Sequence, residues 1–453
     1  MDKMIRESFR KYLEEAIGCD RALVAFSAFD QPAKVSVRLN PFKTGHGFEG
    51  ASVSWNPYGR LLEERPKFTL DPHFHGGAYY VQDSSSMFVG YVFRQLLGNV
   101  NPSGIIRVLD LCAAPGGKTT DLAASLREAF GDRFILVSNE VMKQRAGVLA
   151  DNVALWGDPN VAVTSDDPRA FSLLPDYFDV VVADVPCSGE GMFRKDEQAQ
   201  KQWSEDNVSL CQARQKRIIA DMWPSLKPGG VLIYSTCTFN RYENDDNVEW
   251  IAEELGADVA WPEIENMQGV IRTRQGFSLV PGHVEGEGQY CAALVKHASA
   301  LPVRNICTKS GRKQPMPLPQ DIKSLFSTEV ELRQKGDMAI GVPSNIAADV
   351  SVLESVLHVI SAGCAAGVLK GRTLVPDADL ALSMIRAQDA FPIADVDLKT
   401  ALAFLHKDAI ILPDCERGYV LIRYEGVALG FVKNLGNRCN NLHPQGRRIR
   451  MDI

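Results

Sequence analysis

"GIIRVLDLCAAPGGKTT", Gly104 to Thr120, is the stretch that decides the fold. It begins with an apolar, β-branched run that is typical of a buried strand, and a helix is expected from about Gly117. The two adjacent glycines between them allow the backbone to approach a ligand closely. The helix that starts there presents free N–H groups and the positive end of its dipole, which suits a carboxylate or a phosphate. The stretch therefore predicts a strand, a ligand-binding loop and a helix.

The same alternation of strands and helices continues toward the C-terminus. Further strand-like runs are "RFILVSN", "NVAVTS", "YFDVVVAD" and "GGVLIYST". Helices are expected from about residue 143, over about 208–226 and in "ENDDNVEWIAEEL". This order predicts a doubly wound, mostly parallel α/β sheet. Since ligands of such sheets lie at the carboxyl ends of the strands, we expect the functional residues there.

The pattern divides the chain into four regions. Residues 1–78 form a small α+β domain with short strand-like pieces, 79–297 the α/β domain, 298–320 a linker rich in proline and lysine, and 321–453 an α+β region. In the last region we expect one or two helices and then the strands "AIILPD", "GYVLIRYE" and "VALGFVK". The 453 residues leave room for about three domains of about 150 residues each.

Composition narrows the class of protein. The net charge of -7 argues against a surface covered in positive charge, so a nucleic acid would have to meet a local basic patch. No apolar run approaches the length of a membrane span, and the charged amphipathic start "MDKMIRESFRKYLEEA" has no signal-peptide core, so we expect a cytoplasmic protein. The ten cysteines contain no CxxC pair, which favours reduced thiols and no bound metal.

Acidic residues at two further strand ends indicate the cofactor. Glu140, in "SNE", is placed to accept hydrogen bonds from ribose hydroxyls. In "TSDDP", one of Asp166 and Asp167 could hold an adenine amine, while the other begins a turn before Pro168. The glycine loop matches neither the dinucleotide GxGxxG motif nor the P-loop. A nucleoside that carries a carboxylate, with no phosphate-binding signature, points to S-adenosylmethionine.

Two thiols end neighbouring strands, Cys187 in "DVPCSGEGMF" and Cys237 in "GGVLIYSTCTF". Carbon 5 of a pyrimidine is a poor nucleophile that becomes reactive when a thiolate adds to carbon 6, so methylation there requires a cysteine. Asp184 could hydrogen-bond or protonate ring nitrogen 3 if burial raises its pKa. A second group near the ring would help product release. From these residues alone, either thiol could be the nucleophile.

The motifs "DLCAAPGGKTT", "DVPCSGEGMFR" and "YSTCTF", in this order, resemble those of the Sun-type RNA 5-methylcytosine methyltransferases, in particular the bacterial RsmF type. "SVRLNPFK", "YYVQDSSSM" and "GFVKNLGNRCNNLHPQ" extend the resemblance to most of the chain. The resemblance implies a class I Rossmann-like methyltransferase domain and a PUA-like RNA-binding module near the C-terminus. We also expect a monomer.

The resemblance assigns roles that the spacing alone leaves open. It implies that Cys237 is the nucleophile, that Cys187 assists product release and that Asp184 acts at the base. It places S-adenosylmethionine on Cys112, Ala113, Ala114, Pro115, Gly116, Gly117, Lys118, Glu140, Asp167 and Asp184. The sequence departs from the family pattern in the doubled Asp166-Asp167, and some relatives carry aspartate in place of Glu140. Cytosine-5 DNA methyltransferases use the cysteine of a Pro-Cys pair, so Pro186-Cys187 alone would suggest the opposite roles.

Candidate RNA contacts are scattered. The basic residues near the C-terminus are Lys433, Arg438, Arg447, Arg448 and Arg450, and the alternative for them is a solvated surface tail. Lys309, Arg312 and Lys313 of the linker could follow phosphates. Tyr79, Tyr80 and Phe193 could stack on unpaired bases, but the sequence does not distinguish them from core residues.

The predicted function is therefore methylation of carbon 5 of cytosine in RNA, and the resemblance implies small-subunit (16S) ribosomal RNA. Transfer RNA is the nearest alternative substrate. An RNA-binding ribosome-assembly factor without catalysis is an alternative of another class, although the intact thiol pair and glycine loop argue against it. A methyltransferase of proteins or small molecules would have no use for the paired thiols.

Overall fold

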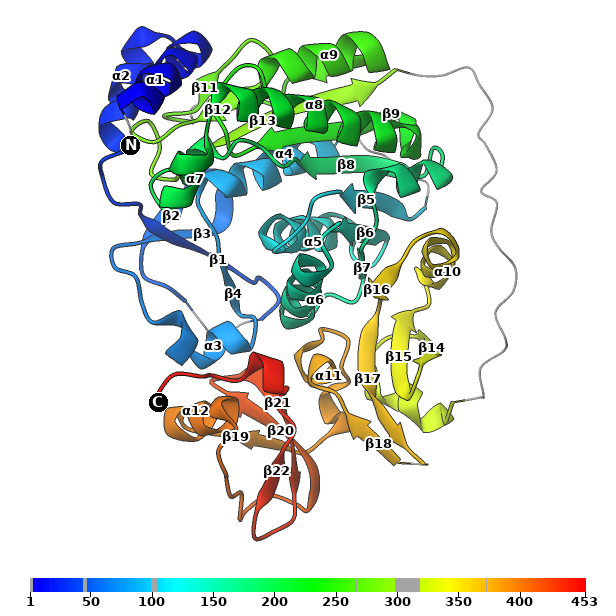
Figure 1. The fold of residues 1–453 in the computed structure, drawn as a ribbon. Coiled ribbons are helices and arrows are strands. Elements are labelled where there is room, and N and C mark those ends of the chain that lie inside the picture. The colour runs from blue at the N-terminus through cyan, green and yellow to red at the C-terminus, as the bar shows by residue number, and fades with distance from the viewer. Residues whose placement is uncertain (1–2, 44–46, 99–103, 265–266, 298–317, 372) are drawn as a thin grey trace.

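The computed structural model describes residues 3–43, 47–98, 104–264, 267–297, 318–371 and 373–453. The N-terminal part of the chain lies beside the central domain and reaches the last C-terminal module at α3 (Pro72–His75) (Figure 1). In the described part of the chain, no helix combines the length and apolarity that a membrane span requires. Most of the predicted linker, including Lys309, Arg312 and Lys313, lies outside the described residues.

In the described residues, the N-terminal part consists of three α-helices and an antiparallel sheet with strand order β2-β3-β1-β4. Its elements are α1 (Lys3–Ile17), α2 (Cys19–Ala28), β1 (Val35–Leu39), β2 (Ala51–Val53), β3 (Asn56–Leu62), α3 (Pro72–His75) and β4 (Tyr79–Val81). Val37 of β1 pairs with Val81 of β4, so this sheet continues beyond residue 78. Strand β4 leads directly into the helix α4 (Phe88–Leu97) of the next domain.

The central sheet has the doubly wound arrangement that the alternation predicts. In sheet order its strands are β11 (Ile271–Arg272), β12 (Phe277–Leu279), β13 (Gln289–Lys296), β9 (Leu226–Thr236), β8 (Phe178–Asp184), β5 (Ile106–Asp110), β6 (Phe134–Asn139), β7 (Val161–Thr164) and β16 (Val359–Ser361), and β10 (Ala257–Ala260) also pairs with β13. The strands from β9 to β7 are parallel, whereas β13 and β16 add antiparallel edges. The parallel strands therefore end at a common edge.

Helices cover both faces of this sheet because its strands are apolar on both sides. Val108 of β5 packs on the face covered by α4, α5 (Gly117–Phe130) and α6 (Lys143–Trp156). The next residue, Leu109, packs on the opposite face, where α8 (Glu205–Met222), α9 (Asp245–Leu255) and α10 (Ala347–Val356) lie. Helix α8 begins where the Ser204 side chain accepts a hydrogen bond from the Asn207 N–H, an N-cap.

The C-terminal region forms two sheets, of orders β14-β15-β17-β18 and β19-β20-β21-β22. The elements not yet given are β14 (Val330–Lys335), β15 (Met338–Pro343), β17 (Cys364–Lys370), β18 (Thr373–Pro376), α11 (Ala378–Leu382), β19 (Ile393–Asp395), α12 (Leu398–His406), β20 (Gly418–Tyr424), β21 (Val427–Asn434) and β22 (Cys439–Asn441). Between α10 and β17 the chain crosses to the central sheet, where β16 pairs with β7. Strand β16, which lies between α10 and β17 in the chain, is thereby an edge strand of the central sheet.

The predicted strand "AIILPD", residues 409–414, is wrong, although β20 and β21 confirm the other two. Ile410 and Leu412 are buried and Ile411 is exposed, which produces the alternation of a strand. The segment makes isolated contacts, in which Ile410 O accepts from the Cys439 N–H and Leu412 O accepts from the Asn434 side chain. Burial pattern and strand pairing are separate properties, and only pairing defines a strand.

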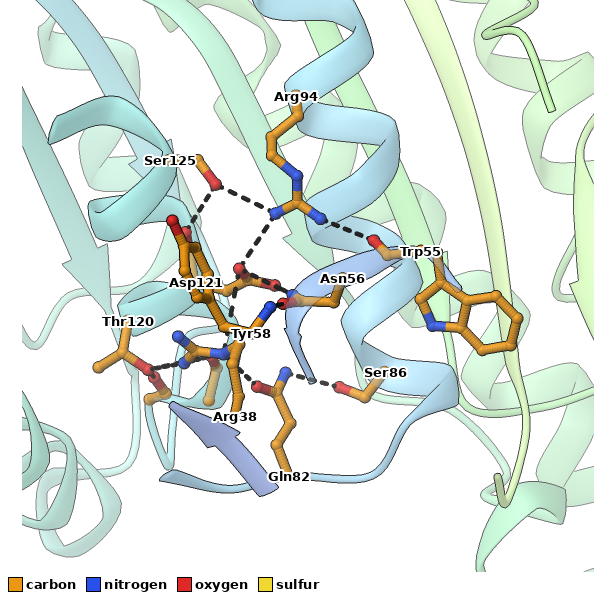
Figure 2. A network of polar contacts seen from close by, with 12 residues as sticks. Arg38, Trp55, Asn56, Tyr58, Gln82, Ser86, Arg94, Thr120, Asp121 and Ser125 are labelled. Carbon is orange, nitrogen blue, oxygen red and sulfur yellow. Dashed lines mark hydrogen bonds and ion pairs between the residues drawn. The ribbon is translucent and has the colours of Figure 1, made fainter. Parts of the chain in front are cut away.

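A buried polar network joins the N-terminal sheet to the central domain (Figure 2). The Arg38 side chain of β1 has no exposed surface, and its Nε donates to Gln82 Oε1 at 2.8 Å while its Nη2 donates to Gly117 O at 3.1 Å. Asp121 Oδ1 lies 4.0 Å from Arg38 Nε and accepts from Arg94 Nη1 at 3.2 Å. Burial lowers the pKa of Arg38, and Asp121 opposes this effect. The cation therefore depends on its neighbours for stabilisation.

Replacing this cation should destabilise the protein. In Arg38→Met the buried Gln82 Oε1 loses its donor and Asp121 loses a neighbouring cation, so we expect the free energy of unfolding to fall by about 3–5 kcal/mol. Urea denaturation followed by tryptophan fluorescence measures the shift of the midpoint. The control is Arg10→Met, which removes an exposed ion pair to Glu14 on α1 and should move the midpoint little. Equal shifts in the two variants would contradict the role of the network.

Candidate active site

Strand register collects the predicted site residues at one edge of the sheet. Asp110, the last residue of β5, lies opposite Ser138 of β6 and Val182 of β8. Asp184, the last residue of β8, lies opposite Ser235 of β9. The loops that follow these strands therefore start side by side, as expected for the carboxyl end of a parallel sheet.

The two thiols lie in contact. Cys187 Sγ is 3.1 Å from Cys237 Sγ, and both side chains are half-buried. The hydrogen bond to Cys237, together with burial, raises the pKa of Cys187 well above its ordinary value. Cys187 is thus held as a thiol that can donate its hydrogen to the Cys237 sulfur. The pairing across two loops, which the sequence left as an inference, is present in the structure.

Close packing joins the two loops that carry the thiols. The Gly191 N–H donates to Cys237 O at 2.8 Å, and a Cβ at Gly191 would lie 2.8 Å from the same oxygen. A side chain at this position would push the loops apart, so the approach requires glycine. Ser188 Oγ and Thr238 Oγ1 add a hydrogen bond of 2.9 Å between the loops.

A buried carboxylate supports the Cys187 loop from behind. Glu243 Oε2 accepts hydrogen bonds from the Ser188 N–H at 3.0 Å and from Gln215 Nε2 at 2.7 Å. The same Gln215 nitrogen donates to Pro186 O at 3.0 Å. Burial and, after it, the nearby Glu190 raise the pKa of Glu243 to about 7. These contacts hold the backbone on both sides of Cys187 in place.

Asp184 lies within a ring of hydrogen-bond donors. Its Oδ1 accepts from Ser235 Oγ at 2.8 Å and from Gln289 Nε2 at 3.0 Å, and its Oδ2 accepts from Lys118 Nζ at 2.8 Å. Burial lowers the pKa of Lys118, but contact with Asp184 more than offsets this, so the pKa is raised. These three donors fix the orientation of the Asp184 carboxyl group and hold it against the Lys118 ammonium.

The glycine loop has the shape of a ligand cradle. Gly116 has φ of 112°, a conformation that favours glycine, and α5 starts at Gly117 with its first N–H groups directed toward the loop. Asp110 is buried next to the loop, and its Oδ2 accepts a hydrogen bond from Thr119 Oγ1 at 2.7 Å. Its Oδ1 has no hydrogen-bond partner among the residues that the structure describes. Burial raises the pKa of Asp110 to about 7. An unpaired acidic oxygen beside free N–H groups fits a zwitterionic amino-acid moiety.

The other predicted cofactor residues occupy the neighbouring strand ends. Cys112, Ala113, Ala114 and Pro115 form the turn between β5 and α5, and burial raises the pKa of the Cys112 thiol. Glu140 is buried after β6, where its Oε2 lies 3.0 Å from Arg145 Nη1. Carboxylate, loop and helix terminus together fit a nucleoside that carries an amino acid.

Asp166 and Asp167 make different contacts. Asp166 Oδ2 accepts from the His358 N–H at 2.8 Å, so this side chain contacts the segment between α10 and β16. Asp167 accepts from the Arg169 N–H at the start of a short 3-10 helix, and about half of its side chain is exposed. Asp167 is thus the more accessible of the two, and its contact with adenine stays a prediction.

Sequence reasoning missed several residues that shape the site. Ser235 and Gln289 hydrogen-bond Asp184, Asn139 joins the ends of β5, β6 and β7, and Glu243 supports Cys187. Ser235 could have been found from the sequence, because it lies near the end of the predicted strand before Cys237, and parallel strands end at one edge of the sheet beside Asp184. No local signal exists for Gln289, because β13 joins the sheet antiparallel and outside the alternation.

The structure separates the candidate RNA contacts. Phe193 is a core residue that packs against Phe9, with ring centroids 5.1 Å apart, and Tyr79 is buried with its hydroxyl donating to Asp71. Tyr80 is half-buried. Arg447 is engaged in ion pairs with Asp151 and Asp379, whereas the other basic residues near the C-terminus are exposed, namely Lys433, Arg438, Arg448 and Arg450.

Comparison with known families agrees with this geometry. The chain matches the model of 16S rRNA methyltransferase RsmB/F over residues 99–295, the N-terminal domain of 16S rRNA methyltransferase RsmF over residues 5–84 and the methyltransferase RsmF PUA domain over residues 391–449. Among curated relatives, the ribosomal RNA small subunit methyltransferase F of Serratia proteamaculans is 31% identical and aligns over 92% of this chain and 91% of that protein. The protein of the same name from Vibrio vulnificus is 29% identical, over 97% and 96%.

Solved structures show the same fold. A methyltransferase homolog protein from Pyrococcus horikoshii has a TM-score of 0.53 at 23% identity, over 65% of this chain and 100% of that chain. The structure of NSun6 from Pyrococcus horikoshii with SFG also has a TM-score of 0.53, at 18% identity, over 64% and 98%. Both likenesses concern the fold.

The raised pKa of Asp110 predicts a pH-dependent stability. Its ordinary pKa of 3.8 rises to about 7 in the folded protein, so between these values the native state holds a proton that the unfolded state has released. Stability therefore falls as pH rises through this window. Asparagine does not titrate, so we expect the melting temperature of Asp110→Asn relative to the wild type to rise by several degrees from pH 5 to pH 8, without cofactor. Scanning fluorimetry measures this difference.

The exposed Asp389 supplies the control for this measurement. Asp389→Asn should change the melting temperature by the same small amount at both pH values. A difference between wild type and Asp110→Asn that stays constant from pH 5 to pH 8 would show that Asp110 does not titrate in this range.

Proposed function

Because the chain belongs to the family of 16S rRNA methyltransferases of the RsmB/F type, we propose that it methylates carbon 5 of a cytosine in RNA. The observation that carries this proposal is the contact between Cys187 and Cys237, 3.1 Å apart and beside Asp184. Methylation of an exocyclic amine needs no thiol, whereas carbon 5 chemistry needs a cysteine that adds to carbon 6. The PUA-domain match and the exposed basic residues near it support RNA as the substrate.

The residues at the glycine loop would hold S-adenosylmethionine, which supplies the methyl group when bound. The free N–H groups at the start of α5 suit its carboxylate, the unpaired Oδ1 of Asp110 its ammonium, and Glu140 its ribose hydroxyls. Asp167, at the end of β7, is the proposed partner of the adenine amine. The loop residues from Cys112 to Lys118 complete the site.

Cys237 is the proposed nucleophile. Its thiolate attacks carbon 6, a carbon–sulfur bond forms, and the electron pair of the carbon 5–carbon 6 double bond becomes available at carbon 5. Cys187 is the protonated member of the pair, so it can stabilise the Cys237 thiolate before attack. The Asp184 carboxyl group, in contact with Lys118, passes a proton to nitrogen 3 as the thiolate adds, which makes carbon 6 more electrophilic, and takes that proton back when the product is released.

Release of the product requires that the bond between carbon 6 and the Cys237 sulfur breaks. Water accepts the proton on carbon 5, the carbon 5–carbon 6 double bond forms again, and the carbon–sulfur electron pair leaves with Cys237. The Cys187 thiol, whose sulfur lies 3.1 Å from the departing one, donates to it and stabilises the thiolate. The proposed role of Cys187 in product release is this stabilisation of the departing sulfur.

The two thiols predict opposite behaviour of two variants. Cys187→Ala should accumulate a covalent protein–RNA adduct that survives denaturing gels, and Cys237→Ala should form none and lose methyl transfer by about 10³-fold or more. The control is Cys211→Ala, a buried thiol on α8, which should turn over without accumulating adduct. The reverse pattern would make Cys187 the nucleophile.

Product analysis tests the position of the methyl group and the class of RNA. The purified protein is incubated with labelled S-adenosylmethionine and either 16S ribosomal RNA or transfer RNA, and the RNA is digested to nucleosides for mass spectrometry. We expect 5-methylcytidine from ribosomal RNA. Label in transfer RNA alone would support the alternative substrate, and 4-methylcytidine would refute the cysteine mechanism. A protein that binds ribosomal RNA but neither binds nor uses the cofactor would be an assembly factor.

A further inference from the structure

A second cavity lies outside the thiol site, where three parts of the chain meet. Its volume is about 570 Å³, enough for a nucleotide. Its wall is formed by residues 65–69, Phe74 and 79–81 from the N-terminal part, by Asn152, Leu155 and Trp156 of α6, and by Met451 near the C-terminus. Figure 1 shows the C-terminus beside α3 and α12, close to this junction. We call this cavity the junction pocket.

The junction pocket has the chemistry of a nucleotide site. Phe74 and Tyr80 are half-buried aromatic residues of its lining, so part of each side chain is exposed and could contact a base. Arg65 and Lys67 are exposed lining residues, and the Arg65 guanidinium lies 5.6 Å from the centroid of the Phe68 ring. Aromatic surface beside positive charge is the combination that binds single-stranded nucleic acid.

Charge distinguishes this pocket from the other large cavity at the junction of α6 with the C-terminal modules. That cavity, of about 350 Å³, is lined by Asp151, Asp158 and Asp379 together with Lys335 and Arg447, so its charges are mixed. Among the described residues that line the junction pocket there is no aspartate or glutamate. The charged residues of the junction pocket lining are therefore all cationic, which favours an anionic ligand.

Polar groups at the pocket wall also contact the glycine loop. The Tyr80 hydroxyl donates to Pro115 O at 3.2 Å, and Asn152 Nδ2 donates to the same oxygen at 2.7 Å. Trp156 is buried in the wall. Through Tyr80 and Asn152 the wall is joined directly to the loop that the cofactor would occupy.

We propose that the junction pocket binds a nucleotide of the substrate RNA that is not the target cytosine. Its base stacks against Tyr80 and Phe74, and its phosphate lies between Arg65 and Lys67. The identity of the ligand as RNA rests on the proposed function. The pocket anchors the RNA outside the thiol site, so it contributes to the affinity for RNA and leaves the chemical step unchanged.

Cross-linking tests occupancy without requiring turnover. A 16S ribosomal RNA transcript containing 4-thiouridine is irradiated with the full-length protein, and the cross-linked peptides are identified by mass spectrometry. We expect cross-links within residues 65–81 that decrease when excess unlabelled RNA is added. Cross-links confined to other segments would overturn the proposal. Loss of these cross-links at millimolar adenosine 5′-monophosphate, without loss of RNA binding, would also overturn it in favour of a site for free nucleotides.

Matched variants test how much the junction pocket contributes to RNA binding. Arg65→Ala with Lys67→Ala should weaken RNA binding about tenfold and raise the KM for RNA without lowering kcat, since both side chains are exposed and distant from the thiols. Phe74→Leu keeps an apolar side chain but removes the ring, and should weaken binding about fivefold or more. The control, Arg133→Ala with Arg214→Ala, removes two exposed arginines elsewhere in the α/β domain and should leave KM unchanged.

The outcomes separate this proposal from the proposed function. If the wild type makes 5-methylcytidine and the variants keep its affinity for RNA and its KM, the pocket proposal is wrong and the reaction stands. If the wild type binds RNA with cross-links at residues 65–81 but transfers no methyl group, the reaction is wrong and the pocket proposal stands. Equal weakening in the pocket variants and in the control pair would indicate a general charge effect and would refute the pocket.

Discussion

The parallel pairing of β8 with β9 is the constraint on which the site depends. It places Asp184 opposite Ser235. Cys187 follows Asp184 by three residues and Cys237 follows Ser235 by two, so both thiols lie close to the same edge of the sheet. A register shift of one residue would turn the side chains at both strand ends to the opposite face. The contact between Cys187 and Cys237, and the donors around Asp184, follow from this register.

Buried charged side chains around the site stabilise its loops, although removing each charge from water is unfavourable. Glu243 and Glu190 hold the loops of the two thiols, while Arg38 and Asp121 connect the N-terminal sheet to the start of α5. Desolvation makes each of these groups unfavourable alone, so each needs its partners. The N-terminal part thereby contacts the glycine loop through Arg38, which donates to Gly117 O. Tyr80, which lines the junction pocket, contacts the same loop at Pro115 O.

Much of the site could be predicted from local sequence. The glycine loop, Glu140 and the two thiols lie directly after apolar runs, and alternation places such positions at one edge. The support of these residues could not be predicted, since Gln289 and Glu243 reach the site through tertiary contacts. Nor could the sequence distinguish Phe193, a core residue, from Tyr80, because aromatic residues have the same pattern inside a core and in a pocket wall.

The sequence by itself determined the doubly wound sheet, the position of its ligand edge and the presence of two thiols, because hydrophobic periodicity and strand order are local properties. Tertiary structure decided the 3.1 Å contact between the thiols, the donors that converge on Asp184 and the failure of residues 409–414 to pair as a strand. It also decided that Asp166 contacts the His358 backbone and that three separate segments enclose one pocket. These features depend on distances between residues far apart in the chain, which packing determines.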